Sequence, residues 1–408
     1  MSNDKSLRPR TQILTRGFDP SLSVGSARPA VFRSSTYVFS SPEAAERAFD
    51  VTSGRQRLGE GEQVDLIYSR FNHPNAEILE AHLVPIEAGA TAALVFNSGM
   101  SAIMTAILTF VRPGDTIVYT VPIYGGTQHL IEDFLTLFGI HGVGVVAGDA
   151  KKLDAAIRSA KNLKMVLVET PANPTLIMTD IQQACDSAAS AAKTAGTPKP
   201  ITMVDNTLLG PAFQHPLLHG ADLVMYSATK YLSGLSDMIG GALLAKDAEL
   251  IRLMAAKRGL FGTILQPDEC WMLDGRLTTV GLRMTRASEN AQQIAAALAS
   301  HPKLEQVIFP TLFKDAEQKR ILEKQCDQPG AMLSLVIKGG KKAAFDFLRD
   351  SHCAQRGFVG RRGVACLPSK IDHPLRIYGT RIQRCRSCGG AGASLGGHRR
   401  LARSIGGL

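Results

Sequence analysis

Short apolar runs alternate with stretches of helical periodicity along the middle of the chain. Ala92–Phe96 precedes a helix-like stretch that begins at Gly99, and Thr116–Tyr119 precedes another that begins at Gly125. Such alternation is typical of an α/β fold, with a mainly parallel sheet and helices on both of its faces. Further short runs of the same kind lie at 165–168, 201–204 and 222–225.

The pattern changes at about Arg276. A long helix is predicted over 278–298 and a strand over 333–338, which indicates a smaller C-terminal α+β domain. The first 62 residues show little periodicity apart from a short capped helix that begins at Ser41. We therefore predict an N-terminal arm over 1–62, an α/β domain over 63–277 and an α+β domain over 278–408.

Composition favours a cytoplasmic protein. The first residues are polar and lack the apolar core of a signal peptide. No apolar run approaches the ~20 residues that a membrane helix needs, so no membrane partner is expected. The seven cysteines are irregularly spaced and do not resemble a disulfide framework.

The net charge of +10 comes entirely from the end of the chain. Residues 351–408 hold ten arginines and one lysine against a single acidic residue, Asp372, whereas residues 1–350 are neutral overall. The basic balance therefore says nothing about the partners of the main body. Four of the seven cysteines also lie in this tail.

Lys230 lies in Ser227-Ala-Thr-Lys-Tyr, directly after an apolar run. A partly buried lysine at the end of a strand can lose its proton and form an imine with a carbonyl group. Ser227 and Thr229 provide hydroxyl groups on either side that suit a phosphate. Taken alone, the lysine is equally compatible with an exposed residue after a strand.

Asp205 follows the run 201–204, one βα unit before Lys230. Pyridoxal 5'-phosphate (PLP) requires a carboxylate against its pyridine nitrogen, because the protonated ring accepts electrons from a substrate carbanion. An aspartate in this position also commonly caps a helix or turn. The order of Asp205 and then Lys230 favours the cofactor interpretation over either residue alone.

Two further segments after predicted strands suit a flat, phosphorylated cofactor. Gly99 opens a helix, where backbone N–H groups bind phosphate, and Tyr124 could stack on a ring. An ordinary strand-to-helix turn and a packing tyrosine are the alternatives. Arg70, in Tyr68-Ser-Arg, has a side chain suited to phosphate. Asn173 lies between two prolines in a loop. It is as suited to shaping that turn as to contacting a cofactor.

Together these motifs resemble the Cys/Met-metabolism family of PLP-dependent enzymes over about residues 20–350. The resemblance implies a fold-type I subunit in a homotetramer built of tight dimers. It implies that Lys230 binds PLP and acts in catalysis with Tyr124, which stacks on the ring, and that Asp205 pairs with the pyridinium. The motifs in chain order are Tyr68-Ser-Arg, Ser98-Gly-Met, Tyr124-Gly, Glu169-Thr-Pro-Ala-Asn-Pro, Val204-Asp-Asn-Thr and Ser227-Ala-Thr-Lys-Tyr.

The resemblance also implies the remaining cofactor contacts. Gly99, Met100, Ser227 and Thr229 would hold the phosphate. Tyr68 and Arg70 would reach the phosphate in the neighbouring subunit, so that the site forms only in the dimer.

Within the family, two stretches are most similar to the branch that cleaves cystathionine by β-elimination, a step of methionine biosynthesis. They are Gly234-Leu-Ser-Asp-Met-Ile-Gly-Gly and Arg276-Leu-Thr-Thr-Val-Gly-Leu-Arg-Met. The substrate would be a small amino acid, and the products homocysteine, pyruvate and ammonia. A γ-lyase or γ-synthase on the same scaffold is the alternative.

The chain departs from the family in its last domain. The family's Ser-Trp-Gly-Gly-x-Glu-Ser stretch is missing, as is a later Arg-Leu-x-x-Gly-x-Glu stretch whose arginine pairs with the substrate carboxylate. A PLP-binding protein without activity is therefore a further alternative.

The tail also holds patterns typical of other functions. Cys385, Cys388 and His398 lack the second ligand pair of a zinc site, so no metal is expected. The arginines of 351–408 lack interleaved aromatics, so no nucleic-acid partner is expected either.

We predict that reading-frame errors altered residues 351–408. Val359–Cys366 can be encoded GTG GGG CGG CGT GGA GTC GCT TGC; inserting TC after the Phe358 codon makes the same bases read Ser-Trp-Gly-Gly-Val-Glu-Ser-Leu. The frame is restored at Leu367, where a family-like Leu-Pro-Ser-Lys-Ile-Asp-His begins, and is lost again near Thr380. Resequencing the gene is expected to reveal the missing bases; an intact frame with these codons would contradict the hypothesis.

Overall fold

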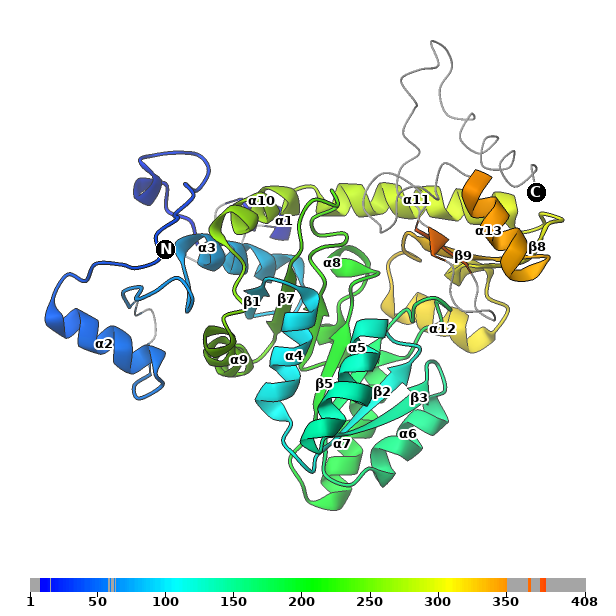
Figure 1. Ribbon diagram of the computed structural model, residues 1–408, viewed down its shortest axis with the longest axis horizontal. Helices are drawn as coiled ribbons and strands as arrows, with labels where there is room; N and C mark the ends of the chain where they lie inside the picture. Colours follow the sequence, from blue (N-terminus) through cyan, green and yellow to red (C-terminus); the bar gives the residue numbers. More distant parts are fainter. Residues whose placement is uncertain are drawn as a thin grey trace, which may run out of the picture.

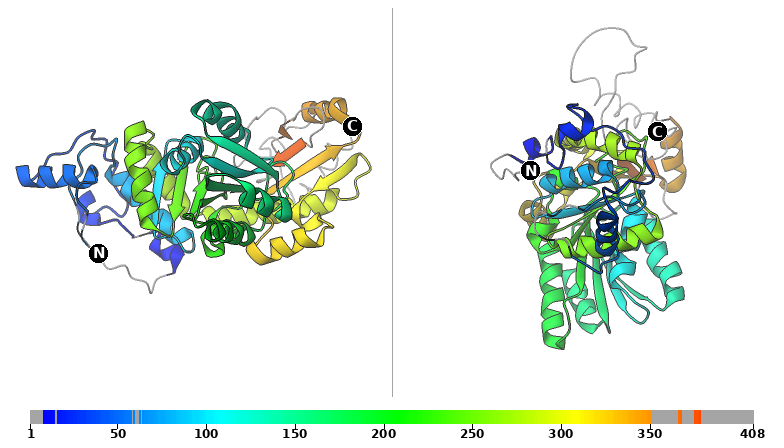
Figure 2. Two further views of the ribbon diagram at one scale, coloured as in Figure 1. Left: turned by 90° about the horizontal axis from the view of Figure 1, so that it is seen from below. Right: turned by 90° about the vertical axis from the view of Figure 1, so that its left-hand side faces the viewer.

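The computed structural model describes residues 8–14, 16–57, 59, 62, 64–350, 366–367 and 375–378. Most of the predicted reading-frame change, and the cysteine pair near its end, lie outside the described residues. Helix α2 (Pro42–Thr52) lies at one end of the molecule, and strands β8 (Leu304–Ile308) and β9 (Met332–Ile337) lie at the other (Figure 1; Figure 2, left). The first helices are α1 (Pro9–Gln12) and α2 (Pro42–Thr52).

A seven-stranded sheet forms the centre of the molecule, with strand order β1-β7-β6-β5-β4-β2-β3. Only β7 runs against the others, because it pairs antiparallel with β1 and with β6 while the remaining pairs are parallel. The strands are β1 (Ala92–Phe96), β2 (Thr116–Val121), β3 (His141–Val146), β4 (Leu163–Glu169), β5 (Ile201–Asp205), β6 (Leu223–Tyr226) and β7 (Gly241–Ala245).

Helices cover both faces of this sheet (Figure 1). In β4, Met165 and Leu167 pack on the face covered by α4 (Gly99–Phe110) and α9 (Ala248–Phe261). Val166 and Val168 pack against α6 (Ala150–Ser159) and α7 (Ile181–Ala195) on the opposite face. Because both faces are buried, β4 and its neighbours β2 and β5 are nearly continuous apolar runs instead of alternating ones, whereas the edge strand β3 is mostly exposed.

A four-stranded antiparallel sheet of order β10-β11-β9-β8 forms the C-terminal part. The long helix α11 (Val280–Leu298) joins the two parts. Its Met284 packs into the core on one face of the large sheet. Its Ile294 and Leu298 pack into the core of the four-stranded sheet. The other elements here are β8 (Leu304–Ile308), α12 (Ala316–Gln325), β9 (Met332–Ile337), α13 (Gly340–Asp350), β10 (Cys366–Leu367) and β11 (Leu375–Tyr378).

The predicted α/β architecture is confirmed, and so are the strands after which the candidate residues were placed. The long helix begins at Val280, two residues later than predicted. Strand β7 was not predicted, because its Gly-Ala-Leu-Leu-Ala run lacks the β-branched and aromatic residues typical of strands. The remaining helices are α3 (Pro74–Leu83), α5 (Gly125–His129), α8 (Gly210–Phe213) and α10 (Pro267–Leu277), and none of the described helices is long and apolar enough to span a bilayer.

A buried arginine ties α9 to β1 and to the chain before α3. Arg258 is 1% exposed, and its Nη1 donates to Glu80 Oε1 at 2.6 Å and to the Val95 carbonyl at 2.8 Å. Its Nη2 donates to the Phe71 carbonyl at 3.0 Å. The guanidinium thus satisfies a buried carboxylate and two backbone carbonyls at once.

We expect Arg258→Ala to lower the free energy of unfolding by about 3–5 kcal/mol, because it leaves the Glu80 carboxylate buried without its cation. Urea denaturation of the cofactor-free protein measures the loss. Arg252→Ala is the matched control on the same helix: its ion pair with Glu249 is exposed, so the expected loss is below about 1 kcal/mol. Equal losses in the two variants would contradict a special role for the buried arginine.

Candidate active site

The predicted site residues other than Tyr68 and Arg70 follow strands that all end at one edge of the large sheet. β1, β2, β4, β5 and β6 run in the same direction, so the loops after them meet at this edge. Glu169 at the end of β4 is level with Asp205 at the end of β5, and Asp205 is level with Met225 in β6. In open α/β sheets this is where ligands bind.

Asp205 is a buried carboxylate at the centre of this edge. It is 8% exposed, and its Oδ1 accepts a hydrogen bond from the Thr207 backbone N–H at 3.0 Å. Burial raises the pKa of Asp205, and the hydrogen bonds from Thr207 offset only part of this effect. A cationic group placed against the carboxylate would stabilise its ionised form.

Lys230 lies in the turn that follows β6. Its backbone N–H donates to the Ser227 carbonyl at 3.1 Å, and its own carbonyl accepts from Gly234 at 2.7 Å. The side chain is half-buried, and burial lowers the pKa of the Lys230 amine. The neutral amine, which is the nucleophilic and basic form, is therefore present at a lower pH than in an exposed lysine.

Thr207 connects the two titratable residues, and the sequence analysis assigned it no role. Its backbone N–H binds Asp205, and its Oγ1 accepts from the Ser227 backbone N–H at 2.9 Å. A hydroxyl two residues after a strand-end aspartate is the signal that could have identified it. Through Thr207 the end of β5 fixes the start of the segment that carries Lys230.

The first turn of α4 packs directly against Ser227. Ser98 caps this helix by accepting from the Ser101 N–H at 3.1 Å. A Cβ atom added to Gly99 would lie 3.1 Å from the Ser227 Cβ, and one added to Gly241 would lie 2.3 Å from the Ser98 carbonyl oxygen. Only glycines allow this close approach, which places a helix N-terminus and a hydroxyl side by side, as a phosphate requires.

Tyr124 precedes α5, and its ring is 42% exposed above the edge. A Cβ atom added to Gly126 would lie 2.7 Å from the Tyr124 ring and 3.1 Å from the Met100 sulfur, so these two side chains border the same space. Glu169, for which the sequence analysis proposed no role, holds this segment: its carboxylate accepts from the Tyr124 N–H at 2.6 Å and from the Asn173 N–H at 3.2 Å. A charged residue ending a buried strand was the available signal.

The three remaining predicted residues each have partners that the structure describes. Thr229 Oγ1 donates to the Gly240 carbonyl at 3.3 Å and accepts from the Gly240 N–H at 3.1 Å, so its hydroxyl closes the loop after β6. Tyr68 and Arg70 lie elsewhere, against the end of α9. The Arg70 guanidinium carbon is 5.4 Å from the Tyr68 ring centre, and Arg70 donates to the Gly259 carbonyl.

The residues that the edge brings together fit PLP. Asp205 is a buried carboxylate that a cationic ring nitrogen would stabilise, Lys230 is a half-buried amine with a lowered pKa, and Gly99 opens a helix of 12 residues beside the Ser227 hydroxyl. The ring nitrogen, the aldehyde and the phosphate of the cofactor thus each have a matching group.

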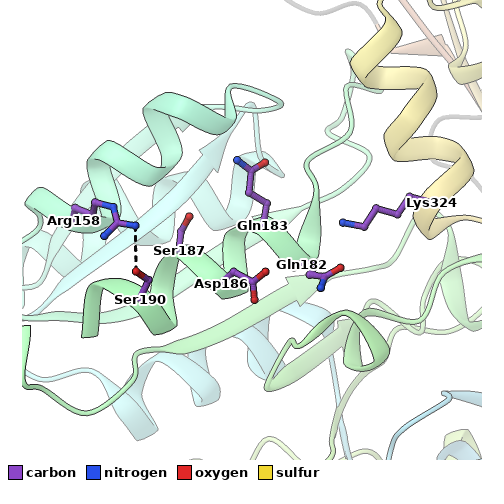
Figure 3. Close-up of a pocket in the computed structure, with 7 residues that line it drawn as sticks. All are labelled: Arg158, Gln182, Gln183, Asp186, Ser187, Ser190 and Lys324. Atoms are coloured by element: carbon purple, nitrogen blue, oxygen red, sulfur yellow. Dashed lines mark hydrogen bonds between the residues drawn. The ribbon is translucent and has the colours of Figure 1, made fainter. Parts of the chain in front are cut away.

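A separate polar groove of about 480 Å³ lies among α6, α7 and α12 (Figure 3). Arg158 donates to Ser190 across one end of it at 3.3 Å. None of the predicted site residues is among its lining residues, which are Arg158, Gln182, Gln183, Asp186, Ser187, Ser190 and Lys324. The groove is therefore distinct from the edge that holds Asp205 and Lys230.

The chain is similar in sequence and structure to several known proteins. L-methionine gamma-lyase of Pseudomonas putida is 34% identical over 83% of this chain and 80% of its own length. Cystathionine beta-lyase MetC of Bacillus subtilis is 36% identical over 66% of each chain. The crystal structure of metB from Corynebacterium glutamicum matches with a TM-score of 0.80 at 27% identity, covering 99% of this chain and 98% of that one.

The family model of the Cys/Met metabolism PLP-dependent enzymes matches residues 10–361, which extends the predicted similarity at both ends. The fold is accordingly that of the fold-type I enzymes, and the cofactor is pyridoxal 5'-phosphate. The chain belongs to the family of Cys/Met metabolism PLP-dependent enzymes.

Proposed function

We propose that the protein is a carbon–sulfur lyase that cleaves L-cystathionine by β-elimination in methionine biosynthesis. With one water molecule consumed, the products are L-homocysteine, pyruvate and ammonia. The observation that carries the proposal is the convergence of buried Asp205 and half-buried Lys230 on one sheet edge, linked through Thr207. The choice of cystathionine rests on the similarity of 234–241 and 276–284 to the β-lyase branch.

Bound PLP supplies an electron sink that acidifies the substrate Cα–H bond. Asp205 holds the proton on the ring nitrogen, since its ionised carboxylate pairs with that cation. The Lys230 amine would remove the Cα proton as a general base, and burial, which lowers the pKa of Lys230, favours the neutral form that this role requires. Tyr124 covers the ring and excludes water from that side.

The cofactor phosphate would be held by the N-terminus of α4 at Gly99 and Met100 and by the hydroxyls of Ser227 and Thr229. The hydroxyl of Thr229 would do so in addition to its bonds with Gly240. Tyr68 and Arg70 would complete the site of a neighbouring subunit. A dimer of dimers in the cytoplasm, which the family resemblance implies, is part of the proposal.

γ-Elimination by a γ-lyase, or the corresponding γ-replacement by a synthase, is the second candidate. The observation in its favour is coverage: the methionine gamma-lyase matches 83% of this chain, whereas the beta-lyase matches 66%. The two reactions leave different keto acids. β-Elimination of cystathionine gives pyruvate, and γ-elimination gives 2-oxobutyrate.

We expect the purified protein to bind PLP with visible absorbance and to release pyruvate from L-cystathionine. Lys230→Ala is expected to lose both the covalent cofactor absorbance and the activity. Asp205→Asn is expected to keep the cofactor attached to Lys230 and to lose at least about a hundredfold in kcat, because the ring nitrogen is no longer held protonated. Lactate dehydrogenase coupling and mass spectrometry identify the keto acid.

A product of 2-oxobutyrate would replace the β-lyase assignment by the γ-lyase. Cofactor binding without any keto acid would identify the inactive alternative. A parent protein that attaches no PLP would contradict the whole proposal.

The lowered pKa of Lys230 makes a second prediction for the cofactor-free protein. Since burial disfavours the ammonium form, the amine should lose its proton, and react with an acylating reagent, at lower pH than an exposed lysine does. Quantitative peptide mass spectrometry across a pH series compares Lys230 with Lys152, whose side chain is 73% exposed. A midpoint for Lys230 equal to or above that of Lys152 would contradict the prediction.

A further inference from the structure

Two arginines from outside the sheet contact the segment that follows Lys230. Arg283, in the first turn of α11, donates from Nη1 to the Tyr231 carbonyl at 2.7 Å and from Nη2 to the Leu232 carbonyl at 2.9 Å. Its Nε also donates to Thr279 Oγ1 at 3.2 Å, which fixes the direction of the guanidinium. The two carbonyls immediately after the lysine are therefore held by one planar fork.

Arg276, near the end of α10, holds the next part of the same segment. Its Nη1 and Nη2 form a bidentate pair with the Asp237 carboxylate at 2.6 and 2.7 Å, and its Nη1 also donates to Ser233 Oγ at 3.0 Å. The Arg276 side chain is 15% exposed and that of Asp237 is 47% exposed. The two arginines are linked to each other, because Arg283 Nη2 donates to the Arg276 carbonyl at 3.1 Å.

The segment itself has little regular structure to hold it. Between β6 and β7 the chain forms turns without a helix or strand. Its internal bonds include those from the Ser233 N–H to the Ala228 carbonyl at 2.9 Å and from the Gly234 N–H to the Lys230 carbonyl at 2.7 Å. Buried backbone carbonyls in such a segment need partners from elsewhere, and the guanidinium fork of Arg283 provides two of them.

Gly234 shows how closely Arg283 is seated. It has φ +70°, and a Cβ atom added there would lie 1.9 Å from Arg283 Nη1. Any larger residue would displace the guanidinium from the Tyr231 and Leu232 carbonyls. The glycine at position 234 therefore leaves the space that the Arg283 guanidinium occupies.

The helix that carries Arg283 is itself rigidly placed. Val280 and Met284 pack in the core on one face of the large sheet. Ile294 and Leu298 pack in the core of the four-stranded sheet. The Lys230 segment is therefore attached to a helix that both cores hold in position, instead of depending on its own turns.

We propose that Arg276 and Arg283 are positioning residues that fix the Lys230 segment against α11 and so keep the lysine amine in place for the reaction. Arg283 contacts the backbone of the segment, and Arg276 contacts the side chains of Ser233 and Asp237. The two arginines therefore act on the reaction through the position of Lys230. The inference rests on the proposed function of Lys230. A small displacement of a catalytic group costs up to about a hundredfold in rate, which sets the expected size of the effect.

The test uses Arg283→Ala, Arg283→Lys and Asp237→Asn, with Arg286→Ala as the matched control. Arg286 lies one turn further along α11, is 68% exposed and pairs with Glu289. In the cofactor-free proteins, hydrogen exchange at the Ser233 and Gly234 amides is expected to speed up about tenfold or more in Arg283→Ala. Arg283→Lys and Asp237→Asn should give smaller increases, and Arg286→Ala none.

In the cofactor-loaded proteins, borohydride reduction followed by peptide mass spectrometry measures the fraction of PLP attached at Lys230. Arg283→Ala should reduce this fraction and lower kcat by about ten- to a hundredfold, with KM changed less than about threefold. Arg283→Lys should recover part of kcat. If Arg283→Ala only lowers the melting temperature, while exchange at Ser233 and Gly234 and attachment at Lys230 stay at parental values, the proposal is wrong.

The outcomes separate this inference from the proposed function. Unchanged exchange in the cofactor-free variants overturns the positioning role, even if Lys230 binds PLP as proposed. Failure of the parent protein to attach PLP at Lys230 overturns the proposed function, while accelerated exchange in Arg283→Ala would still show that the arginine holds the segment.

Discussion

The common direction of β1, β2, β4, β5 and β6 is the constraint on which the rest of the site depends. Because these strands run parallel, their carboxyl ends meet at one edge, and residues far apart in the chain become neighbours. The level pairing of Glu169 with Asp205 is one result. Glu169 then holds the segment of Tyr124, and Thr207 connects Asp205 to the segment of Lys230.

Burial shifts the two central groups in a complementary way. It raises the pKa of Asp205 and lowers that of Lys230, so it favours the neutral form of each. A cationic ring nitrogen against Asp205 reverses the first shift, whereas the second is useful as it stands, because an amine must be neutral to attack a carbonyl or remove a proton.

The segment that carries Lys230 is held in place without secondary structure of its own. Its carbonyls and polar side chains find partners on α10 and α11, and α11 is in turn packed into both cores. The C-terminal part of the chain therefore contributes to the order of the site through this helix.

The alternation of apolar runs and helical stretches by itself predicted the α/β fold, because strands buried on both faces must be continuously apolar. Local motifs also predicted Gly99, Tyr124, Asp205 and Lys230 as site residues, since each lies shortly after such a run. Only the tertiary structure determined the place of β7, whose Gly-Ala-Leu-Leu-Ala run lacks the β-branched and aromatic residues typical of strands. The same holds for the roles of Thr207, Glu169, Arg276 and Arg283. Those roles depend on hydrogen bonds between residues distant in sequence, as from Arg283 to Tyr231, and no local pattern encodes such a contact.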